Sequence, residues 1–152
     1  MAPDVLETYR VHGKLMHLLF ERIKTTEDID PAVESLIIEG KLSTDKGNEL
    51  KEKITSLLAQ QPYKDWFSGK YEIRNETSIL KKEGISRPDR VMRDKNNVVT
   101  VVDYKFGKVR NNKYSKQVSN YMDLLKEMGY KDVKGYIWYI NNEVLLEEVK
   151  AG

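Results

Sequence analysis

Residues 87–108 read RPDRVMRDKNNVVTVVDYKFGK. Within them, residues 98–102 are β-branched throughout and show no alternation of polar and apolar positions, which predicts a strand buried on both faces. Asn96-Asn97 supplies a turn directly before that strand. We therefore expect residues 87–93 to form the preceding antiparallel strand, joined to the buried strand by this turn.

Charged side chains gather where the predicted buried strand ends. Residues two apart in a strand share a face, so Asp103 and Lys105 are expected to project together. Asp89 can reach them from the neighbouring strand. Two carboxylates that converge beside one amine are typical of a site for a hard cation, with a positive group for an anionic substrate.

This pattern resembles that of the PD-(D/E)xK nucleases, and most closely the RecB-like branch found at the C-terminus of AddA-type and other UvrD/Rep-family helicase–exonucleases. Pro88-Asp89 corresponds to the PD element and Asp103-Tyr104-Lys105 to the (D/E)xK element. Residues 117–121, QVSNY, match the QxxxY motif of that branch. His17, in GKLMH, stands where the branch carries a histidine on its first helix. The four motifs occur in the expected order over most of the chain.

The resemblance implies an α/β (α+β) fold of the restriction-endonuclease-like kind, with helices flanking a central mixed β-sheet. We expect a single domain over residues 1–152, mainly helical over 1–68 and built of sheet plus helix over 70–150. Hydrophobic periodicity and capping residues predict the individual elements. These are helices over 4–24, from the Asp30-Pro31 N-cap to Gly40, from Ser43 or Thr44 to Pro62 and over 113–129, a strand over 70–80, and a hairpin around Asn141-Asn142.

Metal ligands and catalytic groups follow from the resemblance. It implies a set of metal ligands: His17, Asp89, Asp103 and the backbone carbonyl of Tyr104, with Glu76 as either a further ligand or an exposed strand acid. Carboxylate ligands suit Mg²⁺, and an imidazole ligand makes Mn²⁺ the alternative. Lys105 would orient the attacking water and stabilise the transition state. Gln117 would point toward the metal site or the DNA strand.

Positive charge is concentrated in one segment. The net charge is +2, yet residues 105–116 contain five basic residues and no acid. Such a segment suits contacts with a phosphate backbone that do not read base sequence; the alternative is a solvated loop. The residues expected to contact DNA are Arg87, Arg90, Lys108, Arg110, Lys113, Lys116 and Tyr121.

Composition excludes several other classes. The absence of cysteine excludes a cysteine-ligated iron–sulfur cluster and a zinc finger. No apolar run approaches 18 residues and no signal-peptide pattern is present, so we expect a cytoplasmic protein without a membrane partner. The GxxxxGK[ST] pattern of an ATPase is absent from the sequence. The resemblance implies a helicase motor, which would therefore be a partner, in the same polypeptide or in a complex.

Together with these features, the resemblance implies a Mg²⁺- or Mn²⁺-dependent DNA exonuclease domain that acts on single strands or strand ends in repair or recombination. Because the chain starts almost directly in the motif-bearing first helix, it is expected to be either an excised domain of a larger helicase–exonuclease or a stand-alone endonuclease. Two alternatives remain open. One is a catalytically inactive nuclease-fold module that binds DNA, and the other is an interaction module whose motifs arise by chance.

Overall fold

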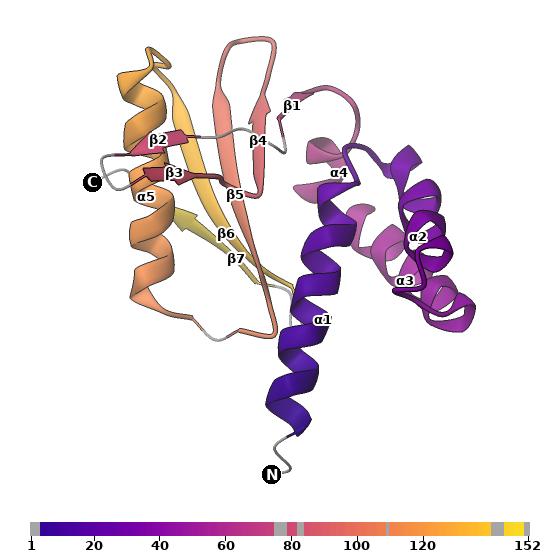
Figure 1. The fold of residues 1–152 in the computed structure, drawn as a ribbon. Coiled ribbons are helices and arrows are strands. Elements are labelled where there is room, and N and C mark those ends of the chain that lie inside the picture. The colour runs from indigo at the N-terminus through magenta and orange to yellow at the C-terminus, as the bar shows by residue number, and fades with distance from the viewer. Residues whose placement is uncertain (1–3, 75–78, 82–83, 109, 141–144, 151–152) are drawn as a thin grey trace. The chain divides into compact units, whose positions relative to one another are not determined.

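The computed structural model describes residues 4–74, 79–81, 84–108, 110–140 and 145–150. The chain divides into two compact units (Figure 1). Residues 18–71 form one, which we call the helical unit. Residues 1–17 together with 72–152 form the other, which we call the sheet unit. Among the described residues, no helix is long and apolar enough to cross a membrane.

The helical unit is a small all-α assembly. It contains the last turn of α1 (Asp4–Glu21), the short helix η1 (Thr26–Asp28), α2 (Ile29–Ile38), α3 (Thr44–Leu58) and α4 (Tyr63–Trp66). Ser43 caps α3, because its side chain accepts a hydrogen bond from the amide of Lys46. Trp66 and Phe67 are buried in the core of this unit.

One helix of this unit begins earlier than predicted. The Asp30-Pro31 pair suggested that α2 starts there, but α2 begins at Ile29 with Asp28 as its N-cap residue. The reason is η1, which runs directly into α2. The side chain of Asp28 accepts hydrogen bonds from the amides of Lys24 and Thr25, so it stabilises the start of η1 rather than of α2.

The sheet unit is built around a five-stranded mixed sheet in the order β1-β4-β5-β6-β7. Its strands are β1 (Glu72–Ile73), β4 (Arg90–Arg93), β5 (Val99–Phe106), β6 (Val133–Ile140) and β7 (Leu145–Val149). Strands β5 and β6 are parallel and are joined by α5 (Asn112–Glu127); the other neighbours are antiparallel. The predicted mixed α/β fold, with helices flanking a central sheet, is confirmed.

Two strand predictions in this unit are wrong in their bounds. The strand predicted over residues 70–80 is divided between β1 and β2 (Ile79–Lys81), and β2 pairs with β3 (Gly84–Ser86) in a separate two-stranded sheet. The strand predicted over residues 87–93 begins only at Arg90. Pro88 has no N–H for a ladder bond, and the N–H of Asp89 bonds to a side chain instead. The turn predicted at Asn141-Asn142 lies outside the described residues.

Strand β5 is buried on both faces, as predicted. Its odd-numbered residues Val99 and Val101 pack with Val91, Tyr121 and Leu125 in one core cluster. Its even-numbered residues face the other way, where the rings of Tyr104 and Trp138 are in edge contact, 5.7 Å between centroids. The two faces of β5 thus present alternate residues to different surroundings, and this alternation positions the candidate site.

Candidate active site

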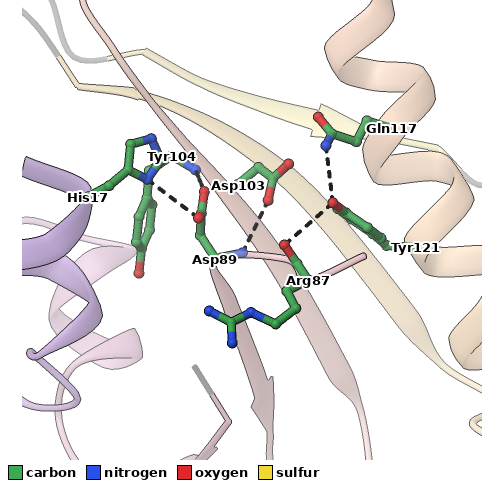
Figure 2. A network of polar contacts seen from close by, with 7 residues as sticks. All are labelled: His17, Arg87, Asp89, Asp103, Tyr104, Gln117 and Tyr121. Atoms are coloured by element: carbon green, nitrogen blue, oxygen red, sulfur yellow. Dashed lines mark hydrogen bonds and ion pairs between the residues drawn. The ribbon is translucent and has the colours of Figure 1, made fainter. Parts of the chain in front are cut away.

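Asp89 and Asp103 stand opposite each other where β4 and β5 meet. Arg90 pairs with Val102 in the antiparallel register. One residue before Arg90 and one residue after Val102, Asp89 therefore lies beside Asp103. The N–H of Asp89 donates to Oδ1 of Asp103 at 3.2 Å, and the N–H of Tyr104 donates to Oδ2 of Asp89 at 2.8 Å (Figure 2). The structure therefore brings the two predicted aspartates together, because each carboxylate accepts a hydrogen bond from a backbone amide of the other strand's segment.

His17 comes to the same place from α1. Its Nδ1 lies 3.4 Å from Oδ1 of Asp89, on the side of Asp89 away from Gln117 (Figure 2). The imidazole packs edge-on against Phe106, with 5.0 Å between ring centroids. A Cβ on Gly13 would lie 3.7 Å from the carbonyl oxygen of Phe106, an ordinary contact.

Burial makes a negative charge on Asp103 costly. The residue is 3% exposed, and burial, followed by the charge of Asp89, raises its pKa to about 6. Lys105, the amide of Asp89 and His17 act in the opposite direction, with smaller effects. A pair of adjacent carboxylates with this energetic cost would be stabilised by a bound cation.

The donor set fits a divalent metal ion by its chemistry. Two carboxylates and one imidazole are available, and Asp89 links them. The N–H and C=O of one strand residue point to the same side, so the carbonyl of Tyr104 points to the side on which Asp89 lies. Within the part of the chain that the structure describes, however, no three His, Asp or Glu side chains form a group that could hold a metal ion. Glu76 lies outside the described residues.

Lys105 shares the face of Asp103, as the spacing predicted, and lies near the start of α5. Its Nζ is 4.4 Å from the centroid of the Tyr114 ring. Tyr114 lies in the helix predicted over residues 113–129 and belongs to none of the sequence motifs. No sequence signal joins a lysine at a strand end to a tyrosine nine positions later, because the contact depends on how α5 crosses the sheet.

The QxxxY motif supports the chain just before Asp89. The side-chain amide of Gln117 donates to the hydroxyl of Tyr121 at 3.1 Å, and that hydroxyl donates to the carbonyl of Arg87 at 3.5 Å (Figure 2). Tyr121 is 1% exposed. The expectation that Tyr121 contacts DNA is therefore wrong for this fold, because its ring belongs to the core and its hydroxyl faces the PD segment.

The predicted DNA-contacting cations fall into two groups. Exposed side chains are found at Arg87, Lys108, Arg110, Lys113 and Lys116, and Arg110 pairs with Glu147 at 3.1 Å. Arg90 is fully buried, so its assignment to a DNA surface is wrong. Its charge instead acts on buried Tyr104, whose pKa is raised by burial and lowered in part by Arg90. Arg90 follows Asp89 directly in sequence, but consecutive residues along a strand face opposite sides, so this adjacency did not predict that Arg90 is buried.

Comparison with known proteins gives a family and several similar solved structures. A family model described as the PD-(D/E)XK nuclease superfamily matches residues 3–150. No curated protein matches the chain. The solved structure of a protein named SSO0001 matches 90% of this chain with 17% sequence identity and a TM-score of 0.39. This chain spans 66% of the length of that protein.

Proposed function

The chain belongs to the PD-(D/E)XK nuclease superfamily, and on that premise we propose that it is a divalent-metal-dependent deoxyribonuclease that degrades DNA from strand ends. We further propose that it works as the nuclease domain of a helicase–exonuclease in DNA repair or recombination. The observation that supports catalysis most strongly is the pair of hydrogen bonds from the amide of Asp89 to Asp103 and from the amide of Tyr104 to Asp89, with Lys105 on the face of Asp103.

In this proposal a metal ion is held by the carboxylates of Asp89 and Asp103, His17 and the carbonyl of Tyr104. Mg²⁺ is the preferred ion and Mn²⁺ the alternative, since the set is rich in oxygen but includes an imidazole. When bound, the ion supplies charge neutralisation at the phosphate and lowers the pKa of a water molecule. It would also offset the burial and the repulsion from Asp89 that together raise the pKa of Asp103.

Lys105 supplies the positive group of the proposed mechanism. Its ammonium group donates hydrogen bonds only, and it is half-buried at the edge of the acidic pair. It would donate to the attacking water and to the phosphoryl oxygens on which negative charge develops. Tyr121 and Gln117 act indirectly. The hydroxyl of Tyr121, bonded to Gln117, donates to the carbonyl of Arg87 and so holds the segment that carries Asp89.

Exposed cations near the site support binding of a nucleic acid backbone. Arg87 directly precedes Pro88-Asp89, while Lys108, Lys113 and Lys116 follow Lys105 through the start of α5. Lysine contacts to phosphates position a strand without reading its bases, so we propose little sequence preference. The preference for DNA and the association with a helicase motor rest on the resemblance to RecB-like nucleases.

Cleavage of internally labelled DNA tests this function. Linear single strands, linear duplex and circular single strands would be incubated with Mg²⁺, Mn²⁺ or EDTA, and an RNA strand of the same sequence would serve as the matched substrate. We expect metal-dependent shortening of linear DNA and none of circles or RNA. Cleavage of circles would indicate an endonuclease. Activity equal in EDTA and Mg²⁺ would contradict the proposal.

One observation favours a second candidate, a nuclease-fold module that binds DNA without cutting it. The described side chains form no group of three that could hold a metal ion. Calorimetric titration with Mn²⁺ separates the two candidates. Binding that is lost in Asp103→Asn supports the nuclease, whereas DNA binding with no Mn²⁺ uptake supports the inactive module.

A further inference from the structure

We infer that Tyr114 is a positioning residue that holds the ammonium group of Lys105 for the proposed reaction. This inference rests on the proposed function, in which Lys105 is the residue that contacts the phosphate. Tyr114 lies in the first turn of α5, and Lys105 lies near the end of β5. Neither residue type nor spacing predicts their contact. It arises because α5 is the crossover helix that connects the parallel strands β5 and β6.

The geometry is that of a cation–π contact. Nζ of Lys105 lies 4.4 Å from the ring centroid of Tyr114, well inside the usual limit of about 6 Å. Nζ of Lys113 lies 5.6 Å from the same centroid. Lys105 is half-buried and Lys113 is exposed, so the contact with Lys105 is less weakened by water. Tyr114 therefore holds the lysine of the catalytic motif more firmly than its neighbour in α5.

The ring itself is fixed by the core. Tyr114 packs against the buried cluster formed by Val118, Met122, Ile137, Tyr139 and Val149. The helix also sits close to the sheet, because a Cβ on Gly135 would lie 2.4 Å from Sδ of Met122 and 2.8 Å from Cγ1 of Val118. A ring anchored in this way is a rigid support, whereas a free lysine side chain has four flexible bonds. The contact therefore reduces the freedom of Lys105 before substrate arrives.

The Tyr114 ring also holds the ammonium group of Lys105 without occupying the N–H donors of that group. In the described part of the chain, neither Asp89 nor Asp103 forms an ion pair with Lys105, although the charge of Lys105 acts on Asp103. An ion pair would occupy the N–H donors with carboxylate oxygens. The face of Tyr114 attracts the positive charge and leaves those donors available. We expect this arrangement to favour an incoming phosphate over the neighbouring carboxylates.

Kinetics of DNA cleavage test the inference. Tyr114→Leu removes the ring but keeps an apolar side chain against the core, and should lower kcat about 2- to 30-fold, the range that corresponds to a cation–π contact. KM and Mn²⁺ affinity should stay near wild type. Tyr114→Phe keeps a ring and should restore kcat to within about two-fold. Tyr130→Leu makes the same change at a partly buried tyrosine on the adjoining core cluster and controls for lost packing.

A double-mutant cycle shows whether Tyr114 acts through Lys105. If it does, Tyr114→Leu should have no further effect on kcat in a Lys105→Ala background. Independent losses that multiply, or an effect of Tyr130→Leu equal to that of Tyr114→Leu, would overturn the inference.

NMR separates this inference from the proposed function. The ε-CH₂ protons of Lys105 should be shifted upfield by the ring current in wild type and Tyr114→Phe, and should return to ordinary values in Tyr114→Leu. An inactive wild type that shows the shift would refute the nuclease function but support the contact. Absence of the shift in wild type would overturn the positioning role whatever the activity.

Discussion

The backbone amide of Asp89 donates a hydrogen bond to the carboxylate of Asp103, at 3.2 Å. The carboxylate of Asp89 in turn accepts a bond from the amide of Tyr104, the residue after Asp103. The segment that carries Asp89 and the end of β5 that carries Asp103 therefore hold each other's carboxylates in position. Because the first bond uses the main chain of Asp89, a side-chain substitution at Asp89 should leave Asp103 in place.

Asp103→Asn should abolish metal-dependent cleavage while it stabilises the metal-free protein at neutral pH. Asparagine keeps an oxygen to accept from the amide of Asp89 but removes a buried charge beside a like charge. Urea unfolding in EDTA and the cleavage assay check both parts. Asp132→Asn, at an exposed aspartate, is the control for loss of a negative charge. Cleavage at the wild-type rate would show that Asp103 is not a ligand.

The metal-free protein should lose stability as the pH rises from about 4 to about 6. The pKa of Asp103 is about 6 in the folded state against an ordinary value of 3.8, so the folded state binds more protons between these values. The unfolding free energy therefore falls across this window and levels off above it, by about 3 kcal/mol at most. Urea unfolding of wild type and Asp103→Asn across this range isolates the contribution. A difference between them that does not change with pH would contradict the assignment.

Lys105→Met should lower kcat about 100- to 1,000-fold, the usual cost of removing a donor that stabilises charge in a transition state. Methionine keeps an unbranched apolar side chain, so KM and Mn²⁺ affinity should change little. Lys116→Met, at an exposed lysine of α5, should have the opposite effect on the two kinetic constants, with a higher KM and little change in kcat. If Lys105→Met raised only KM, Lys105 would be a simple phosphate contact.

His17→Ala should weaken Mn²⁺ binding about 10- to 100-fold, the size of loss seen when a group that supports a metal site is removed. The imidazole lies 3.4 Å from Asp89 and packs on Phe106, so it is placed to bind the same metal ion as that carboxylate. Calorimetric titration measures the change. His12→Ala, at an exposed histidine of the same helix, should titrate like wild type. Identical titrations for the His17 variant would remove His17 from the ligand set and weaken the RecB-like assignment.

Tyr121→Phe should lower the unfolding free energy by about 1 kcal/mol, the usual value of a hydrogen bond, and should weaken Mn²⁺ binding several-fold. The ring would stay in the core, but the hydroxyl that links Gln117 to the carbonyl of Arg87 would be gone. Asp89 would then be held less firmly. Tyr130→Phe, at a partly buried tyrosine on the same side of the sheet, is the matched control. Unchanged metal binding would limit Tyr121 to a structural role.

What the sequence determined by itself is local. The β-branched run at residues 98–102 indicated a strand buried on both faces, and alternation along it placed Asp103 and Lys105 together. Capping and periodicity located α3 and α5 closely. These features depend on the backbone conformation of a few consecutive residues, and side-chain chemistry in sequence order is enough to predict them.

Only the tertiary structure decided which distant residues meet. Arg90 and Tyr121 are expected from sequence to contact DNA, but both side chains are buried in the folded protein. Tyr114 carried no functional signal, yet its ring lies against Lys105. Register places Asp89 opposite Asp103, and a shift of one residue would turn every side chain of β4 to the other face. Such pairings are set by packing across the whole sheet unit, which no short stretch of sequence contains.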